Sequence, residues 1–415
     1  MSASSNKVGP LDDITVIDLT QALAGPYATF LLAGLGASVI KVENPIGGDP
    51  ARNNAPYLGM DGATLVRKHP DDISLSVLGR LRNKLGVTLN LKHAEGPSVL
   101  ADLIKRADIV VDNYSAGTLE RLGVGYEFMK RINPRIVHCS ISGFGQGDAD
   151  GAKAMDVIIQ ALSGVMYTSG EVDTPPVRIG LPIADLGAPL FGVIGILAAL
   201  HQAKRTGVGQ QVDVSMLGTI TSLVACEGYD VAEKCGIPMR TGLTVPRLAP
   251  FGIYRTSNGY IAICASMEAF FRSLFKAMGC PELLEDPRFI SRDLRVHNVE
   301  ALEVLITDWT TSNTTEEAVR ILGECGVPAA PVRQPQEAMR DPRVVRRGET
   351  IPLVHPKYGA TEEIYGMGLP IVFSDASVGF SRPAPALGEH NERVYAEMLG
   401  YDKSRLAELA AKGII

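Results

Sequence analysis

The sequence lacks most of the short motifs that mark common classes of enzyme. Its 415 residues include one tryptophan and six scattered cysteines, none of them in a CxxC pair. This argues against a zinc finger or a disulfide framework, and reduced thiols fit a cytosolic protein best. We find no GxGxxG, P-loop, HExxH or GxSxG motif, which argues against a dinucleotide dehydrogenase, a metalloprotease and a serine hydrolase.

Runs of one charge and long apolar runs are also missing. The net charge is −6 without a block of like charges, whereas a nucleic-acid binder would carry a basic stripe. The longest apolar run, at about 190–200, is shorter than the roughly 20 residues that span a bilayer. Residues 1–10 have no apolar core of a signal peptide. We therefore expect a cytoplasmic protein without a nucleic-acid or membrane partner.

The order of the expected elements indicates an α/β protein. Hydrophobic residues make up 46% of the chain and charged residues 21%, which is typical of globular proteins, and the length requires more than one domain. Residues 11–43 alternate strand, helix and strand with the crossover length of a parallel βαβ unit. The pattern of expected elements changes after about 225, and a hairpin turn follows at Ser257-Asn-Gly259. We predict a large α/β domain over 1–225, a small α+β domain over 226–330, and a linker and return to the large domain over 331–415.

An acidic turn interrupts the apolar centre of the chain. A helix expected over 156–166 ends in Tyr167-Thr-Ser-Gly170, and the turn Glu171-Val-Asp-Thr-Pro-Pro176 follows. The two prolines fix φ and stiffen this turn. A carboxylate on a stiff loop can attack an electrophile, or it can be a solvated loop acid, which is the more common case.

This turn resembles the active-site segment of the class III CoA-transferases, the family of formyl-CoA transferase and carnitine CoA-transferase. The matching positions are Thr168, Gly170, Asp173, Pro175 and Pro176. The resemblance implies that Asp173 is the nucleophile, which forms a mixed anhydride with the acyl group and then an aspartyl-CoA thioester. It also implies a Rossmann-like large domain and an interlocked homodimer, or a heteromer with a related subunit. Coenzyme A would enter as acyl-CoA substrate, and neither a metal nor another cofactor would be needed.

Two further stretches resemble the family's CoA-binding segments. Gln21 and Ala22 belong to a first loop that, in the family, lines the thiol end of CoA. Asn113 and Tyr114 match CoA-contact positions that follow a strand, and Arg121 matches a basic residue facing the CoA phosphates. Since ligands bind where strands end and helices begin in α/β sheets, both stretches are predicted to line the site.

Other candidate ligands have plausible structural roles as well. Arg82 and Lys84 precede a strand, where they could bind the CoA phosphates or remain solvated, and the family places an Asn-Lys pair there. In the glycine-rich loop 143–147, Phe144 could pack near pantetheine or belong to a plain turn. Gly145 is a candidate for close approach to the substrate or for donating its N–H to an oxyanion, as are Gly143 and Gly170.

The substrate prediction comes from a departure from the family pattern. Oxalate-type members carry a run of glycines over the nucleophile, whereas the matching region 239–250 contains only Gly242. Arg240 and Arg247 in this region could bind a second carboxylate, or they could be surface cations. We therefore predict a dicarboxylic acyl group, with succinyl-CoA as the candidate donor.

Two other functions compete with transfer. α-Methylacyl-CoA racemases resemble the chain in the same segment and use a His-Asp pair, but Met155-Asp156 lacks the histidine, and racemisation needs two bases. Asp185 matches the second racemase motif, although a role as helix N-cap explains it equally well, and Asp156 is expected to be structural. A non-catalytic partner subunit is the other alternative, and the matched Asp173 argues against it.

Overall fold

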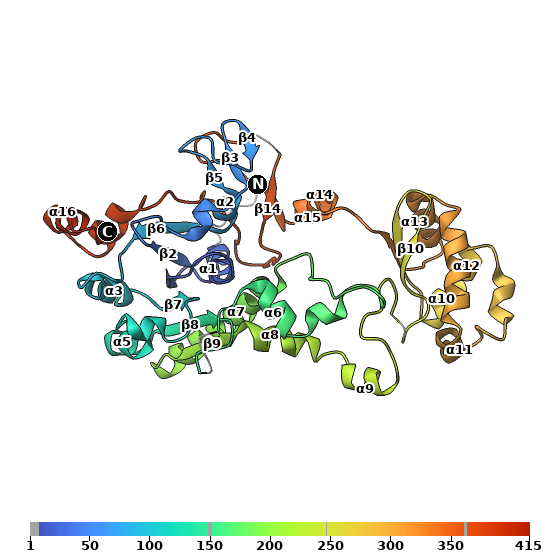
Figure 1. Ribbon diagram of the computed structural model, residues 1–415. Helices are drawn as coiled ribbons and strands as arrows, with labels where there is room; N and C mark the ends of the chain where they lie inside the picture. The colour runs from blue at the N-terminus through green and yellow to red at the C-terminus, as the bar shows by residue number, and fades with distance from the viewer. Residues whose placement is uncertain (1–7, 148–151, 246, 361–362) are drawn as a thin grey trace. The chain divides into compact units, whose positions relative to one another are not determined.

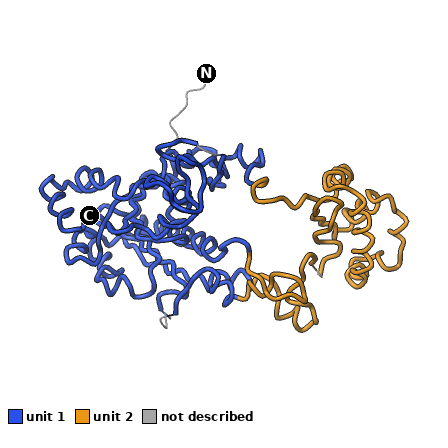
Figure 2. Tube along the Cα trace, turned by 45° about the horizontal axis from the view of Figure 1, so that its top comes forward, with its two compact units in different colours: residues 1–163, 180–224, 339–415 blue, residues 164–179, 225–338 orange. Residues whose placement is uncertain are grey.

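The computed structural model describes residues 8–147, 152–245, 247–360 and 363–415 (Figure 1). These residues form two compact units, the first over 1–163, 180–224 and 339–415 and the second over 164–179 and 225–338 (Figure 2). The division differs from the predicted boundaries mainly at 164–179. This segment carries the acidic turn and lies in the second unit, because it packs on the region around 240.

A six-stranded parallel sheet forms the centre of the first unit, in the order β6-β2-β1-β7-β8-β9. The strands span Thr15–Asp18 (β1), Ser38–Glu43 (β2), Lys84–Thr88 (β6), Ile109–Asp112 (β7), Val137–Ser142 (β8) and Gln211–Ser215 (β9). β7 is buried throughout, as expected for a parallel strand with both faces covered. The predicted α/β class with a Rossmann-like large domain is therefore confirmed.

Helices cover this sheet (Figure 1). They include Ala24–Gly34 (α1), Gly96–Ile104 (α3), Tyr126–Ile132 (α5), Asp156–Leu162 (α6), Ile183–Thr206 (α7) and Met216–Val224 (α8). The apolar face of α3, formed by Val99, Leu100, Leu103 and Ile104, is fully buried in the main core. Its spacing is that of an amphipathic helix, so sequence pattern and packing agree.

The helix α7 is long and apolar enough to cross a membrane by length and composition alone. Half of its most apolar window is buried, and the helix packs against α1, α8, β8 and β9. A core helix of a globular protein meets the same two criteria. The packing therefore accounts for the buried half of this apolar window.

The strand order reverses between β1 and β7, which fixes where a ligand can bind. From β1 the chain proceeds through β2 and β6 on one side, and β7, β8 and β9 extend the sheet on the other. In open α/β sheets, ligands bind at the carboxyl ends of the strands beside such a reversal. The loops after β1 and β7 therefore face a common crevice.

The C-terminal part of the chain covers the edge of the sheet beyond β6. The Tyr395 hydroxyl donates to the Thr88 carbonyl at 2.7 Å, and the Asn90 N–H donates to the Ile414 carbonyl at 2.7 Å. Tyr395 lies in a π-helix, Glu392–Met398 (η4), and the last helix is Lys403–Ala411 (α16). The stretch 53–80 contains a small antiparallel sheet and a helix. These elements are Tyr57–Gly59 (β3), Gly62–Thr64 (β4), Ile73–Ser74 (β5) and Leu75–Arg80 (α2).

The second unit has its own sheet and core. Its strands Phe251–Arg255 (β10), Tyr260–Cys264 (β11) and Ala329–Pro331 (β12) are antiparallel, and the expected hairpin turn closes with a bond from the Thr256 N–H to the Gly259 carbonyl. The helices Glu268–Ala277 (α10), Val299–Thr311 (α12) and Thr315–Glu324 (α13) accompany this sheet. Phe271, Phe275 and Phe289 lie in the core.

Candidate active site

Two loops at the reversal point are joined by a reciprocal pair of hydrogen bonds. The Gln21 N–H donates to Asn113 Oδ1 at 2.7 Å, and Asn113 Nδ2 donates to the Gln21 carbonyl at 2.8 Å. The next residue, Ala22, has a φ of 63° and donates its N–H to Asp49 Oδ1 at 3.0 Å. Because a left-handed alanine persists only where its surroundings hold it, this first loop is preorganised.

Lys84 lies beneath the first loop and is fully buried. Its ammonium is 2.9 Å from Asp18 Oδ2 and also donates to the Pro26 carbonyl and to Thr29 Oγ1, at 3.0 and 2.7 Å. Burial lowers the pKa of Lys84 to about 8 against the attraction of Asp18. All three N–H donors are thus used within the protein, which corrects the prediction that Lys84 binds a CoA phosphate.

Lys41 completes this buried network. It lies 3.1 Å from Asp49 Oδ2 and donates to the Thr20 carbonyl. Lys41 therefore contacts both the start of the first loop and the acid that bonds to Ala22. Burial alone would raise the pKa of Asp18, but Lys41 and Lys84 lower it to about 2. The network therefore keeps Asp18 ionised beneath the loop.

Arg82 is also inside the protein, contrary to the prediction that it faces the CoA phosphates. Its guanidinium packs against the stacked rings of Phe30 and Phe380, at 5.2 and 4.8 Å from their centroids. It donates to the carbonyls of Gly79 and Met367. The C-terminal part of the chain supplies Phe380 and Met367, and it converts an apparent surface cation into a core contact.

A cavity of about 360 Å³ opens beside the first loop. It brings together six of the predicted ligands, namely Ala22, Asn113, Tyr114, Arg121, Phe144 and Gly145. Gln21 supports this cavity through Asn113 and does not line it. The lining also includes two acids, Asp156 and Asp185, but no histidine among the described residues.

Asp185, in the first turn of α7, is the acid whose protonation is most altered by the cavity. Burial, and to a smaller extent the charge of Asp156, raises its pKa to about 6, whereas Arg80 opposes this rise. Asp156 Oδ1 accepts the backbone N–H groups of Ala184 and Asp185 at 2.9 and 3.4 Å. Asp156 therefore caps α7 from a distance, which corrects the interpretation of Asp185 as the N-cap. Within the described part of the chain, the Asp185 carboxylate accepts no hydrogen bond.

The glycine loop borders the same cavity, but its N–H groups are partly used. The Gly145 N–H donates to Ser142 Oγ at 3.0 Å, and the Gln146 N–H donates to Asp213 Oδ2 at 2.8 Å. Gly145 has a φ of 89°, which favours glycine. Its backbone thus borders the site, whereas its N–H is not available to an oxyanion in this conformation.

Asp173 lies in the second unit, where its side chain is exposed. The acidic turn is closed by a bond from the Thr174 N–H to the Glu171 carbonyl at 3.2 Å, and Gly170 has a φ of 107°. Asp173 as nucleophile stays a prediction. Asp173 belongs to the second unit, whereas Asp185 and the other residues that line the cavity belong to the first.

The two predicted carboxylate-binding arginines are both in the second unit and have protein partners. Arg240 donates to the carbonyls of Glu171 and Val172 at 3.2 and 3.3 Å and lies 4.6 Å over the Tyr167 ring. Arg247 pairs with Glu227 at 3.1 Å on the surface. Arg240 thus stabilises the acidic turn, and Arg247 as a carboxylate ligand stays a prediction.

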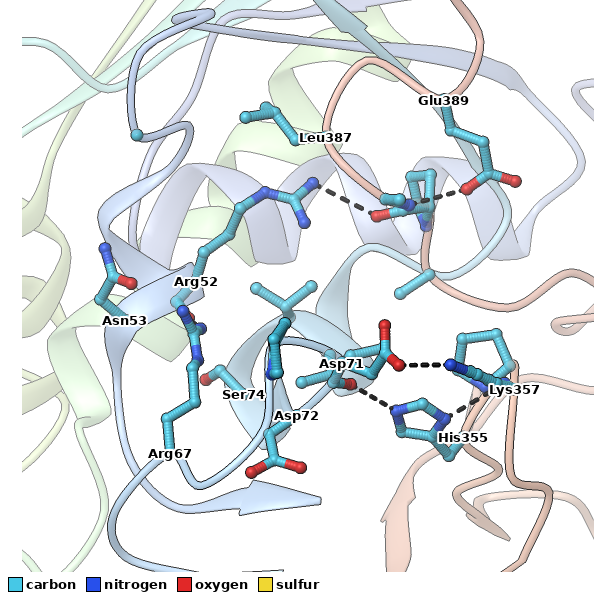
Figure 3. Close-up of a pocket in the computed structure, with 18 residues that line it drawn as sticks. Arg52, Asn53, Arg67, Asp71, Asp72, Ser74, His355, Lys357, Leu387 and Glu389 are labelled. Carbon is cyan, nitrogen blue, oxygen red and sulfur yellow. Dashed lines mark hydrogen bonds and ion pairs between the residues drawn. The ribbon is translucent and has the colours of Figure 1, made fainter. Parts of the chain in front are cut away.

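A second cavity of the first unit, about 610 Å³, contains more charged groups but binds them internally (Figure 3). His355 Nε2 bonds to the Asp71 carbonyl at 2.9 Å, and Lys357 pairs with the Asp71 carboxylate. Arg52 pairs with Glu43 at 2.6 Å. Because these charged groups are already paired within the protein, a charged ligand would gain little by binding there. We therefore assign the site to the smaller cavity. No group of three or more potential metal ligands occurs within the described ranges.

A comparison with protein families decides which family the chain belongs to. The family model of CoA-transferase family III matches residues 11–391. The chain belongs to this family. It is a class III CoA-transferase, so the family resemblance noted in the sequence is confirmed.

Relatives match this CoA-transferase over nearly its whole length. Succinyl-CoA:mesaconate CoA-transferase of Haloarcula hispanica is 35% identical, with 94% of this chain and 96% of that protein covered. Succinyl-CoA–D-citramalate CoA-transferase of Chloroflexus aurantiacus is 36% identical, with 98% of each covered. A crystal structure of a CAIB/BAIF family protein from Brucella suis is similar with a TM-score of 0.80 and 32% identity, covering 95% of this chain and 100% of that one.

Proposed function

We propose that this CoA-transferase moves CoA from succinyl-CoA to a second dicarboxylic acid. The two relatives named above use succinyl-CoA together with mesaconate or D-citramalate, according to their names. Both acceptors are short dicarboxylic acids. The absence of a glycine run in 239–250 agrees with an acceptor other than oxalate.

We propose Asp185 as the acid that carries the reaction, in place of the predicted Asp173. The observation behind this choice is its position in the cavity with Ala22, Asn113 and Gly145. With a pKa of about 6, the carboxylate is ionised at pH 7 but more basic than a solvated aspartate. Since no protein group bonds to it in the described structure, its lone pairs remain free to attack a carbonyl carbon.

The reaction proceeds by exchange at carbonyl carbons. An Asp185 oxygen attacks the thioester carbon of succinyl-CoA, the C–S bond breaks, and CoA leaves as thiolate, which gives a mixed anhydride. The thiolate then attacks the Asp185 carbonyl carbon, and succinate leaves with the bridging oxygen. The acceptor carboxylate repeats these steps in reverse order, forming a new anhydride and then the new acyl-CoA, and Asp185 is regenerated.

CoA would lie along the cavity, with its thiol end at the first loop and its phosphates towards Arg121. The fixed geometry of Ala22 and Asn113 would position the thioester without rearrangement. The Arg121 guanidinium is exposed and bonds only to Thr118 Oγ1 and the Ala116 carbonyl in the described structure. It therefore retains donors for a phosphate.

We also propose that the active form is a homodimer, interlocked as the family resemblance implies. The outward face of α7 exposes Leu190, Phe191, Ile194 and Leu197, with exposed fractions of 38–63%. On α6, Val157, Ile158 and Leu162 are likewise exposed. An apolar surface of this kind is typical of a subunit interface, and a second copy of the chain is the partner we propose.

The two candidate nucleophiles are separated by matched variants. Asp185→Asn should lower CoA exchange between succinate and succinyl-CoA at least about a thousandfold, whereas Asp173→Asn should keep most of it. Wild-type protein incubated with succinyl-CoA labelled in the CoA moiety should retain label that hydroxylamine releases, and Asp185→Asn should not. Loss of labelling in Asp173→Asn, with labelling intact in Asp185→Asn, would restore the original assignment.

A further inference from the structure

A cation at the edge of the first loop has an unused donor. Arg80 is the last residue of α2, and its Nη2 donates to the Ala22 carbonyl at 3.1 Å. Its Nε is buried and has no hydrogen-bond partner in the described structure. Buried donors are nearly always paired, so an unpaired guanidinium N–H beside a substrate cavity calls for a ligand.

The charges around Arg80 indicate which kind of ligand it faces. Burial lowers the pKa of the Arg80 guanidinium, and the charges of Asp49 and Asp185 oppose this effect. Asp49 is already neutralised by Lys41 at 3.1 Å. Arg80 is bonded to Ala22, which lines the same cavity as Asp185, the reacting carboxylate, and its charge interacts with that acid.

The other cations of this region are placed differently. Arg121 and Lys153 line the cavity and are exposed, whereas Arg80 is half-buried, has a buried Nε and contacts the lining through the Ala22 carbonyl. A solvated cation suits the CoA phosphates, and a desolvated one suits a carboxylate that enters the protein with the acyl group. A carboxylate buried without such a partner would lose several kcal/mol of solvation.

We propose that Arg80 binds the distal carboxylate of the dicarboxylic acyl group while its thioester carbon faces Asp185. The inference rests on the proposed exchange at Asp185 and adds the residue that selects dicarboxylic over monocarboxylic acids. The free Nε and a neighbouring Nη form the planar fork that binds a carboxylate through two parallel bonds. Arg80 would retain its bond to Ala22, so that substrate and first loop are tied to one guanidinium.

The test compares two acyl groups of equal length in the full-length protein. Exchange is measured with succinyl-CoA and succinate, and with butyryl-CoA and butyrate, for wild type and Arg80→Gln. We expect kcat/KM for the succinyl pair to fall about tenfold to a hundredfold in Arg80→Gln, while the butyryl pair changes less than about threefold. Arg80→Lys should recover part of the succinyl activity, since it keeps the charge and loses the fork.

Controls separate this inference from folding and from the proposed function. Arg320→Gln, an exposed arginine of α13 paired with Glu324, should leave both substrate pairs unchanged. An equal loss for both pairs in Arg80→Gln would mean that Arg80 only supports the first loop, and it would overturn the inference. A selective succinyl loss in Arg247→Gln instead would also overturn it. Absence of exchange in the wild type, or full exchange in Asp185→Asn, would refute the proposed function rather than the role of Arg80.

Discussion

The Asp156 carboxylate accepts the backbone N–H of Asp185 and so places a second negative charge beside the acid of the cavity. The same oxygen accepts the Ala184 N–H, and Oδ2 accepts a bond from Gln160 Nε2 at 2.7 Å. One carboxylate therefore caps α7 and raises the pKa of its neighbour. These two effects can be separated, because an asparagine retains an oxygen acceptor and loses the charge.

The first prediction concerns the pH dependence of exchange. In the proposed reaction the ionised form of Asp185 is the nucleophile, and its pKa is raised to about 6, so the rate should increase as pH rises through about 6. Asp156→Asn should move this increase to lower pH, since it removes a charge that disfavours ionisation. The measurement is kcat/KM for succinyl-CoA between pH 4.5 and 8. Asp102→Asn, at a half-buried acid that pairs with Lys105 and does not line the cavity, is the control and should leave the profile in place. An unchanged profile in Asp156→Asn would contradict the assignment.

The second prediction is that Asp185→Asn stabilises the protein while it abolishes exchange. A carboxyl whose pKa is higher in the folded than in the unfolded state makes the folded state bind more protons between about pH 4 and 6. Stability therefore falls as pH rises through this range, and the loss remains at pH 7. Removing the titration should raise the free energy of unfolding at pH 7 by up to about 3 kcal/mol.

Urea unfolding at pH 7 and at pH 3.5 checks this prediction. The gain should disappear at pH 3.5, where both states of the wild type carry a neutral carboxyl. Asp173→Asn is the matched control and should have nearly wild-type stability at both values, because its side chain is exposed. A destabilised Asp185→Asn at pH 7 would show that the carboxylate has partners that the cavity does not account for.

The third prediction concerns the buried network under the first loop. Lys84→Met leaves the fully buried Asp18 with one cation in place of two, and breaking such a pair typically costs 3–5 kcal/mol. We expect a loss of about 3 kcal/mol in the free energy of unfolding, part of which Asp18→Asn should restore in the double variant. Lys105→Met, at a surface pair, should cost less than about 1 kcal/mol. A loss of that small size in Lys84→Met would contradict the network.

The sequence predicts those features of the structure that are caused by neighbouring residues, and not those caused by residues far apart in the chain. The hairpin turn at Ser257–Gly259 matches the expectation, because turn residues act over neighbouring positions. Asn113 and Tyr114, which the family resemblance predicts as CoA contacts and which follow the end of β7, line the cavity. The sequence does not predict the buried positions of Arg82 and Lys84, because these depend on residues distant in the chain. Arg82 is covered by Phe380 almost 300 positions later, and Lys84 is held by Asp18 more than 60 positions earlier.

The choice of acid shows the same limit. Asp173 is conspicuous in the sequence because prolines and glycine surround it, but these local features do not determine its exposure. In the sequence, Asp185 fits a racemase motif and a helix N-cap equally well, and what distinguishes it in the structure is burial and the proximity of Asp156 and Arg80. All three causes are tertiary. A signal was available in the apolar sequence that follows Ala184-Asp185, where an acid is costly unless it has a use.

The fourth prediction separates binding of CoA from the chemical step. Arg121→Ala should raise KM for acyl-CoA about threefold to tenfold with little change in kcat, since a phosphate contact far from the thioester contributes uniform binding. KM for the acceptor acid should stay the same. The affinity of Arg121→Ala for acyl-CoA should decrease less with added salt than that of the wild type, because one screened ion pair is lost. Arg131→Ala, in the last turn of α5, is the control. Equal effects on acceptor and acyl-CoA would place Arg121 elsewhere in the mechanism.

The last prediction addresses the apolar face of α7. Ile194 is 63% exposed there, with Leu190 and Leu197 on the same side one turn away. A glutamate at position 194 would be buried without a partner in a dimer and solvated in a monomer, so Ile194→Glu should shift sedimentation from dimer to monomer at micromolar concentration. Val304→Glu, at an apolar residue of α12 with a similar exposure of 59%, should leave the dimer intact. If wild-type protein sediments as a monomer that catalyses exchange, the proposed homodimer is excluded. If Ile194→Glu stays dimeric, the interface lies on another face.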